Sequence, residues 1–264
     1  MEVIGYLLTG ILAGGLAGLF GVGGGVIVVP ALIFLFALLG LPDSLATHMA
    51  IGTSLAAMIP TSISSTMAHK RQGGVDWLSF KILAPTILLG SWLGVMTAIS
   101  LSGSTLQTAL GVGLVLLAIN MFLKKTSADD ASDYHPRHWL LALGGSVIGY
   151  VSSIFGIGGG VMTIPFLSRL GQSMRLCVGT SAACGIPIAL MGAIANIYLG
   201  EKLTDLPQYS SGLVYWPAFA GIVIMSIPFA RLGAKLAQKL PADKLKKLFA
   251  GLMLVVGVKF IFFS

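Results

Sequence analysis

The sequence contains few charged residues. Asp, Glu, Lys and Arg make up 9% of its 264 residues, against roughly 25% in a soluble domain. So few charges cannot cover a surface that faces water, which excludes a soluble enzyme, a nucleic-acid-binding protein and a disordered chain. Hydrophobic residues make up 56%, in segments that are apolar all round rather than alternating as barrel strands do. The composition therefore predicts an all-α, polytopic membrane protein.

Cysteines are also few, and acidic residues are absent from the apolar segments. The two cysteines, Cys177 and Cys184, stand seven residues apart, about 10 Å along a helix, which is too far for a disulfide. None of the nine acidic residues lies within an apolar segment. Pumps and cation transporters commonly carry an intramembrane Asp or Glu. Their absence argues against a cation substrate and against a proton relay through carboxylates.

The chain repeats itself. FGVGGGVIVVP at 20–30 returns as FGIGGGVMTIP at 155–165, and GTS at 52–54 returns as GTS at 179–181. Trp77 then matches Trp216, and Gly94 matches Gly233. Repeats are the first feature to look for in a membrane transporter. The chain is predicted to hold an N-terminal transmembrane repeat (1–123), a cytoplasmic linker (124–138) and a C-terminal transmembrane repeat (139–264).

Each half divides into five apolar segments, of which the second is short. A segment of 14 residues reaches about 21 Å, less than the ~30 Å hydrocarbon core. The first two segments of each half are therefore either short crossings or a re-entrant hairpin. The predicted segments are 3–22, 25–40, 45–69, 77–100 and 104–123 in the first half, and 139–155, 160–173, 176–199, 212–232 and 244–263 in the second.

Charge at the segment ends predicts the topology. Lys70 and Arg71 follow the third segment of the first half, whereas Glu201, Lys202 and Asp205 follow its counterpart. By the positive-inside rule, the matching loops lie on opposite sides of the membrane. This predicts inverted repeats, about ten membrane segments and both termini outside. In the alternative with eight helices, the first two segments of each half merge and the repeats are parallel. No cleavable signal peptide is expected, since a basic start and a cleavage site are missing.

The glycine-rich blocks are the first candidate site. Gly10, Gly14 and Gly18 form a small-residue ridge suited to helix packing. Consecutive glycines instead break a helix at membrane depth, which is tolerated only within protein or beside a wet cavity. Free N–H groups at the next helix start favour an anion, although a packing turn is the alternative. The predicted substrate-binding residues here are Gly21, Gly23, Gly24, Gly25, Gly156, Gly158, Gly159 and Gly160.

The GTS motifs are the second candidate site. We expect Thr53, Ser54, Thr180 and Ser181 to complete the anion site from two symmetric helices. Alternatively, these hydroxyls bond the carbonyl four residues back in their own helix. His48, His69 and Arg175 are candidates for gating or proton coupling, and interfacial anchoring is the alternative for them. Because membrane segments flank the glycines, no dinucleotide motif is present, and no cofactor, metal or catalytic residue is predicted.

These features resemble the TauE/SafE family. The resemblance rests on the duplicated GxxGxGGGxxxxP block, the GTS helices and AHKR followed by GGVDW, and it covers nearly the whole chain. It implies a bacterial inner-membrane exporter of sulfite or of organosulfonates such as sulfoacetate and sulfolactate. The second half departs from the pattern, with Asn196 and a longer acidic loop in place of AHKR.

The sequence thus predicts a secondary transporter that alternates access around a midplane anion site, in contact with the lipid bilayer. Three alternatives stay open. An anion channel would share every motif. A membrane enzyme using Cys184 as a nucleophile lacks a neighbouring base in the sequence. A non-transporting subunit of a larger complex has no specific support. The exact anion, the coupling ion, the direction of flux and the oligomeric state are not indicated.

Overall fold

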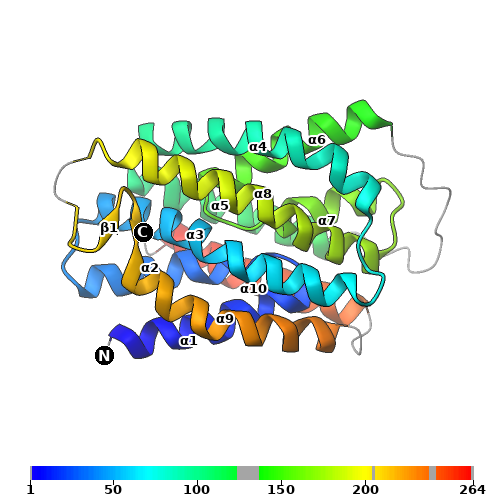
Figure 1. Ribbon diagram of the computed structural model, residues 1–264, viewed down its shortest axis with the longest axis horizontal. Coiled ribbons are helices and arrows are strands. Elements are labelled where there is room, and N and C mark those ends of the chain that lie inside the picture. Colours follow the sequence, from blue (N-terminus) through cyan, green and yellow to red (C-terminus); the bar gives the residue numbers. More distant parts are fainter. Residues whose placement is uncertain (1, 124–136, 204–205, 238–241, 263–264) are drawn as a thin grey trace.

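The computed structural model describes residues 2–123, 137–203, 206–237 and 242–262. Within this part the chain forms ten helices and one short hairpin of strands (Figure 1). Of the predicted linker, residues 124–136 lie outside the described part. The elements are α1 (Glu2–Phe20), α2 (Gly25–Leu38), α3 (Asp43–Lys70), α4 (Trp77–Ser100), α5 (Gly103–Leu123), α6 (His138–Ile154), α7 (Gly160–Arg169), α8 (Met174–Gly200), β1 (Ser210–Ser211), β2 (Val214–Tyr215), α9 (Trp216–Ala237) and α10 (Ala242–Phe262).

The helix ends follow from local chemistry. Gly40, with a φ of 76°, ends α2 in the left-handed conformation that glycine adopts at least cost. Pro42 immediately precedes α3, where its fixed φ favours a helix start. Asp76 caps α4 by accepting hydrogen bonds from the N–H groups of Leu78 and Ser79, at 3.0 and 3.3 Å.

The predicted segments agree with the helices except around residue 212. We expected an all-α chain with a helix from 212. Instead, Ser210 pairs with Tyr215 and Ser211 with Val214 in a two-stranded hairpin, and α9 begins at Trp216. Gly212, with a φ of 52°, permits the tight turn between the strands. By length and composition, four of the described helices, α1, α4, α8 and α9, suit a membrane crossing.

The first two helices of each half form a hairpin. In Figure 1, α1 begins and α2 ends at the left-hand end of the bundle, and α6 begins and α7 ends at the right-hand end. The turns between them lie inside the bundle. With 10 residues, α7 is about 15 Å long, which is too short for a ~30 Å hydrocarbon core. In each half the two helices run antiparallel, as both geometries that the sequence left open require, and the re-entrant form stays a prediction.

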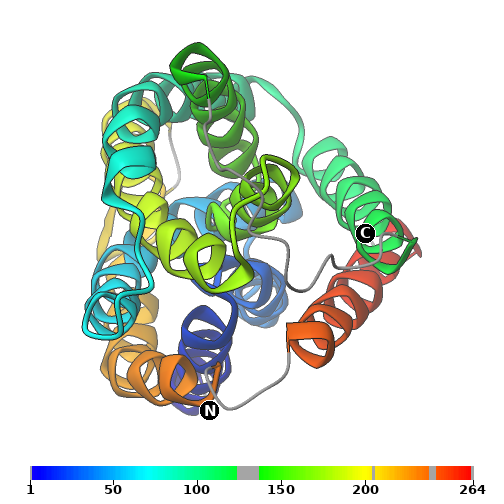
Figure 2. The same ribbon diagram turned by 90° about the vertical axis from the view of Figure 1, so that its right-hand side faces the viewer.

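The helices pack in pairs that join the two halves. Helix α1 lies along α9, α4 along α6, and α3 against α8. Helices α5 and α10 pair with each other and stand to one side of the bundle (Figure 2). Every one of these pairs takes one helix from each half. The two halves therefore form one body around α3 and α8, whose buried faces hold both GTS motifs.

Small residues allow α1 and α9 to touch through their backbones. A Cβ added to Gly10, Gly14 or Gly18 would lie 2.0–2.4 Å from a carbonyl oxygen of α9. In the matching pair, a Cβ on Gly149 would lie 2.3 Å from the carbonyl oxygen of Ile87 in α4. Close approach of this kind is how helices associate where water supplies no driving force. The packing role expected for the glycine ridge is confirmed.

Two neighbouring glycines of α1 provide a test of this packing. Gly14→Ala places a methyl group 2.4 Å from the carbonyl oxygen of Ser226, whereas Gly15→Ala meets nothing within 4 Å. We expect Gly14→Ala to lower the free energy of unfolding by about 1–3 kcal/mol through overpacking. Gly15→Ala should be neutral or stabilise by up to about 1 kcal/mol. Thermal unfolding in detergent measures both, and equal melting temperatures would contradict the packing.

Candidate functional site

The two glycine turns cross each other in direct backbone contact. A Cβ added to Gly158 would lie 1.6 Å from the carbonyl oxygen of Val22 and 3.0 Å from the Cα of Gly23. A Cβ on Gly25 would lie 2.4 Å from the carbonyl oxygen of Gly156. At this crossing, defined as residues 21–25 and 156–160, only glycine allows the two segments to meet. The predicted convergence of the two helix starts is therefore present in the structure.

At the other positions of the crossing, glycine is required either by the backbone conformation or by contact with a neighbouring helix. Gly21 and Gly156, with φ near 65°, rest on the backbones of Val178 and Ile51 in α8 and α3. Gly24 caps α2 with a φ of 81°, a conformation that is costly for other residues. Gly160, the first residue of α7, lies against Val22. Gly159 has a φ of −54° and faces the tip of the Ile188 side chain.

The helix starts at the crossing leave backbone N–H groups without partners in the described chain. The carbonyls of Gly24 and Gly159 accept from the first turns of α2 and α7, and those of Gly21 and Gly156 accept from serine hydroxyls. The N–H groups of Gly23–Gly25 and Gly158–Gly160 donate to no acceptor in the described part of the chain. The carbonyls of Val22, Gly23, Ile157 and Gly158 also accept no hydrogen bond in the described part, but at the two helix caps, Gly24 and Gly159, the carbonyls are used and the N–H groups remain. Such a cluster at two helix N-termini suits an anion.

The GTS motif of α3 binds segments of the second half. The Ser54 hydroxyl donates to the carbonyl of Gly156 at 2.9 Å, and Thr53 Oγ1 accepts from the N–H of Tyr215 at 3.0 Å. Gly52 packs on the carbonyl of Leu213. One helical turn thus holds both the opposite glycine turn and the strand before α9.

The GTS motif of α8 makes the matching contacts with the first half. The Ser181 hydroxyl donates to the carbonyl of Gly21 at 2.9 Å, and Thr180 Oγ1 accepts from the N–H of Asp76 at 2.9 Å. Gly179 packs on the backbone of Gly74. The two serines stand beside the crossing, while the two threonines anchor the chain before α4 and α9. All four hydroxyls bond backbone atoms of the other half, and their direct contact with a substrate stays a prediction.

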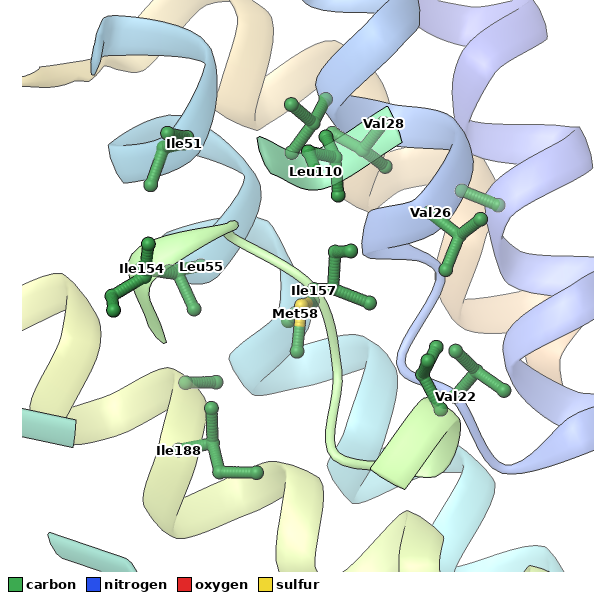
Figure 3. Packing of buried hydrophobic residues seen from close by; sticks show 14 of the residues in the cluster. Val22, Val26, Val28, Ile51, Leu55, Met58, Leu110, Ile154, Ile157 and Ile188 are labelled. Carbon is green, nitrogen blue, oxygen red and sulfur yellow. The ribbon is translucent and has the colours of Figure 1, made fainter. Parts of the chain in front are cut away.

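Apolar side chains surround the crossing. Figure 3 shows Val22, Val26 and Ile157 at the turns, with Met58 of α3 close to Ile157. Besides Ser54 and Ser181, two buried hydroxyls adjoin the crossing: Thr163 Oγ1 would lie 3.1 Å from a Cβ on Gly159, and Ser62 Oγ 3.3 Å from a Cβ on Gly23. Ser62 was not among the predicted site residues. Its signal in the sequence is the hydroxyl-rich stretch TSISST at 61–66, which follows Pro60.

The predicted gating residues lie away from the crossing. Both ring nitrogens of His48 face backbone carbonyls, Nδ1 that of Ser44 at 2.6 Å and Nε2 those of Ala98 and Leu101 at 3.1 Å. His48 lies near the start of α3, at the opposite end of the bundle from the start of α8 (Figure 1). Their gating role is not tested by these contacts.

His69 and Arg175 lie together at that other end. The buried His69 ring donates through Nε2 to the carbonyl of Gly18 at 3.0 Å, and Arg175 donates to the carbonyl of Gln72. Asp76 accepts from Gln172 Nε2 at 2.6 Å, which joins the α3–α4 turn to the α7–α8 turn. Among the described residues, no three His, Cys, Asp or Glu side chains are grouped to hold a metal ion.

Neighbouring glycines at the crossing provide a second test. Gly158→Ala places a methyl group 1.6 Å from a backbone oxygen, which cannot move without displacing the turn. Gly159→Ala meets side chains alone, chiefly the far end of Ile188 at 2.6 Å, which can rotate away, and the Thr163 hydroxyl at 3.1 Å. We expect Gly158→Ala to lower the melting temperature of the purified protein sharply, and Gly159→Ala to lower it little. The reverse order would contradict the crossing.

Comparison with known proteins agrees with this architecture. The family model described as Sulfite exporter TauE/SafE matches residues 6–260. A probable membrane transporter protein of Haemophilus influenzae is 36% identical, covering 96% of this chain and 95% of that protein. A probable membrane transporter protein of Methanocaldococcus jannaschii is 29% identical over 96% and 92%, and YunE of Bacillus subtilis is 25% identical over 99% and 98%.

No solved structure matches the chain. The family match nonetheless covers almost all of it, and the relatives match along nearly their whole lengths. Together with helices suited to cross a bilayer, this makes the chain a multi-pass membrane protein of a transporter family. The glycine blocks and GTS helices that carried the resemblance are the segments that meet at the centre of the fold. The protein belongs to the TauE/SafE family.

Proposed function

We propose that the protein is a secondary transporter that exports a small sulfur-containing anion, sulfite or an organosulfonate, across the bacterial inner membrane. The observation that carries the proposal is the crossing, where two helix N-termini present backbone N–H groups that have no acceptor in the described part of the chain. The family description supports a sulfur oxyanion in particular. The substrate would bind near the bilayer midplane, where the glycine turns of both halves meet.

The N–H donors of the crossing favour an anionic substrate but do not distinguish one oxyanion from another. N–H groups at helix starts bind oxyanions through short, charge-assisted hydrogen bonds. A sulfite or sulfonate group offers three oxygens to such donors. Moving an anion out of water costs several kcal/mol even with good donors. We therefore infer weak to moderate affinity, which suits a carrier that must release its substrate.

We also infer that the two halves are inverted repeats that rock about the crossing. Matching contacts support this. Ser54 bonds Gly156 as Ser181 bonds Gly21, and Thr53 accepts from Tyr215 as Thr180 accepts from Asp76. The two hairpins enter from opposite ends of the bundle (Figure 1). Inverted repeats with broken helices at a midplane site are typical of alternating access.

Charge at the two ends supports one orientation. Lys70, Arg71, Arg169 and Arg175 lie at one end of the bundle, and Glu201 and Lys202 lie at the other (Figure 1). By the positive-inside rule the basic end is cytoplasmic, so both termini would be periplasmic. If protons drive export, His69 and His48 are the candidate residues for proton coupling.

Transport by the reconstituted protein tests the proposed function. Proteoliposomes on a solid-supported membrane are stepped into sulfite, sulfoacetate, thiosulfate, taurine or chloride, with and without a pH gradient. We expect saturable currents with at least one sulfur oxyanion, altered by the gradient, and none with chloride. Currents that rise linearly with concentration would indicate a channel. The absence of any current from folded protein would contradict the proposal.

Paired variants connect transport to the crossing. Gly24→Leu combined with Gly159→Leu fills both helix starts, and we expect it to abolish the current. Gly251→Leu in α10 is the matched control, because a Cβ at that position meets nothing within 4 Å. Thermal unfolding and a single elution peak establish that each variant is folded. Unchanged current in the folded double variant would place the site elsewhere.

Cysteine labelling tests the inverted topology. Arg71 and Glu201 are both exposed and follow matching helices, α3 and α8. We expect a membrane-impermeant maleimide to label Glu201→Cys in whole spheroplasts and Arg71→Cys only in inverted vesicles. The parent chain is the control, because Cys177 and Cys184 are buried. Labelling of both positions from one side would favour the parallel arrangement of eight helices.

A further inference from the structure

One face of α3 carries polar side chains from the crossing to the basic end of the bundle. Met58, Ser62, Thr66 and His69 follow one another at spacings of four, four and three residues, which places them on the same side of a helix. All four are buried, with exposed fractions of 5% or less. Met58 and Ser62 adjoin Gly25 and Gly23, while His69 adjoins Gly74 and Gly179.

Two hydroxyls on this face have no partner. Ser62 Oγ and Thr66 Oγ1 are buried and make no hydrogen bond within the described structure. A hydroxyl in a helix usually bonds the carbonyl four residues back, as Thr61 does to Ala57 at 2.8 Å. Leaving a buried hydroxyl unpaired destabilises a fold. Two of them on successive turns of one buried face indicate a partner that is not part of the protein.

The surroundings indicate the charge of that partner. Ser62 lies at the crossing, where N–H groups lack acceptors, and it also lies against Gly185 of α8. The far end of the face carries His69 and adjoins Lys70, Arg71 and Arg175. No acidic side chain lies on the face between Met58 and His69. Donors at one end and cations at the other suit a small oxyanion.

The matching face of α8 lacks this character. The positions that align with Ser62 and Thr66 are Ala189 and Ala193, and Asn196 aligns with His69. Asn196 bonds the carbonyl of Gly192 within its own helix at 2.8 Å. The polar face is therefore a property of α3 and of one end of the bundle, and the packing that both halves share does not require it.

We propose that Ser62 and Thr66 bind the transported oxyanion as it moves between the glycine crossing and the end of α3 that carries His69, Lys70 and Arg71. This inference rests on the proposed function. The two hydroxyls donate in turn to the anion's oxygens, and His69 with Arg175 receives the anion at the basic end. Each step replaces part of the anion's lost hydration, which lowers the barrier on that side of the crossing.

The test removes the hydroxyls and keeps the shape. Ser62→Ala with Thr66→Val is compared with the parent in sulfite and sulfoacetate currents and in thermal unfolding. A hydrogen bond to a charged group is worth about 1.5–3 kcal/mol, so the double variant should transport at least about tenfold more slowly. Its melting temperature should stay equal or rise, because unpaired buried hydroxyls are removed. Ser62→Thr with Thr66→Ser keeps both hydroxyls and should retain most of the transport.

Ser91→Ala is the matched control. Ser91 is a fully buried serine of α4 whose hydroxyl donates to the carbonyl of Gly149, away from α3. We expect its transport rate to equal that of the parent. A double variant that transports as fast as the parent overturns the inference and leaves the proposed function standing. Loss of transport together with a lower melting temperature also overturns it, because the hydroxyls are then structural. A parent protein that moves no sulfur anion defeats the proposed function itself.

Discussion

The fold depends on one constraint: a chain that leaves its helix inside a membrane must find hydrogen-bond partners within the protein. Here it happens twice, at the turns after Phe20 and Ile154. The two turns lie against each other, so that glycine backbone packs on glycine backbone. Ser54 and Ser181 then bond a carbonyl of the opposite turn. Neither half can arrange its turn alone, which makes the crossing the point where the halves depend on each other.

The same constraint explains why N–H donors remain at the two helix starts. Where a helix starts, the first carbonyls accept hydrogen bonds from N–H groups of the first helical turn, as those of Gly24 and Gly159 do. The first N–H groups have no such partner within the helix. The serines satisfy the carbonyls of Gly21 and Gly156. An anion needs the donors that are left, so the electrostatic preference follows from where the helices start.

Much of this arrangement could be predicted from the sequence, because repeats and glycines are local signals. The segment ends agree with the helices within a few residues, and the consecutive glycines marked the crossing. Partners could not be predicted, since they depend on packing across the halves. The GTS motif does not indicate that Thr53 accepts a hydrogen bond from the N–H of Tyr215, or that Ser54 donates one to the carbonyl of Gly156. Ser62 and Thr66 escaped notice because a membrane-helix hydroxyl usually bonds its own helix. Only the structure shows that these two do not.

Shared and unshared positions then have different explanations. Residues that match between the halves, such as Ser54 with Ser181 or Gly158 with Gly23, make contacts that hold the two turns together. If the scaffold alone set the sequence, α3 and α8 would carry similar side chains beyond the crossing. Instead α3 continues with Ser62, Thr66 and His69, where α8 has alanine, alanine and asparagine. The contacts between the two glycine turns require matching residues in both halves. Transport from one side of the membrane to the other does not require the two halves to match. The unmatched polar face is therefore where a difference between the two sides of the membrane would be encoded.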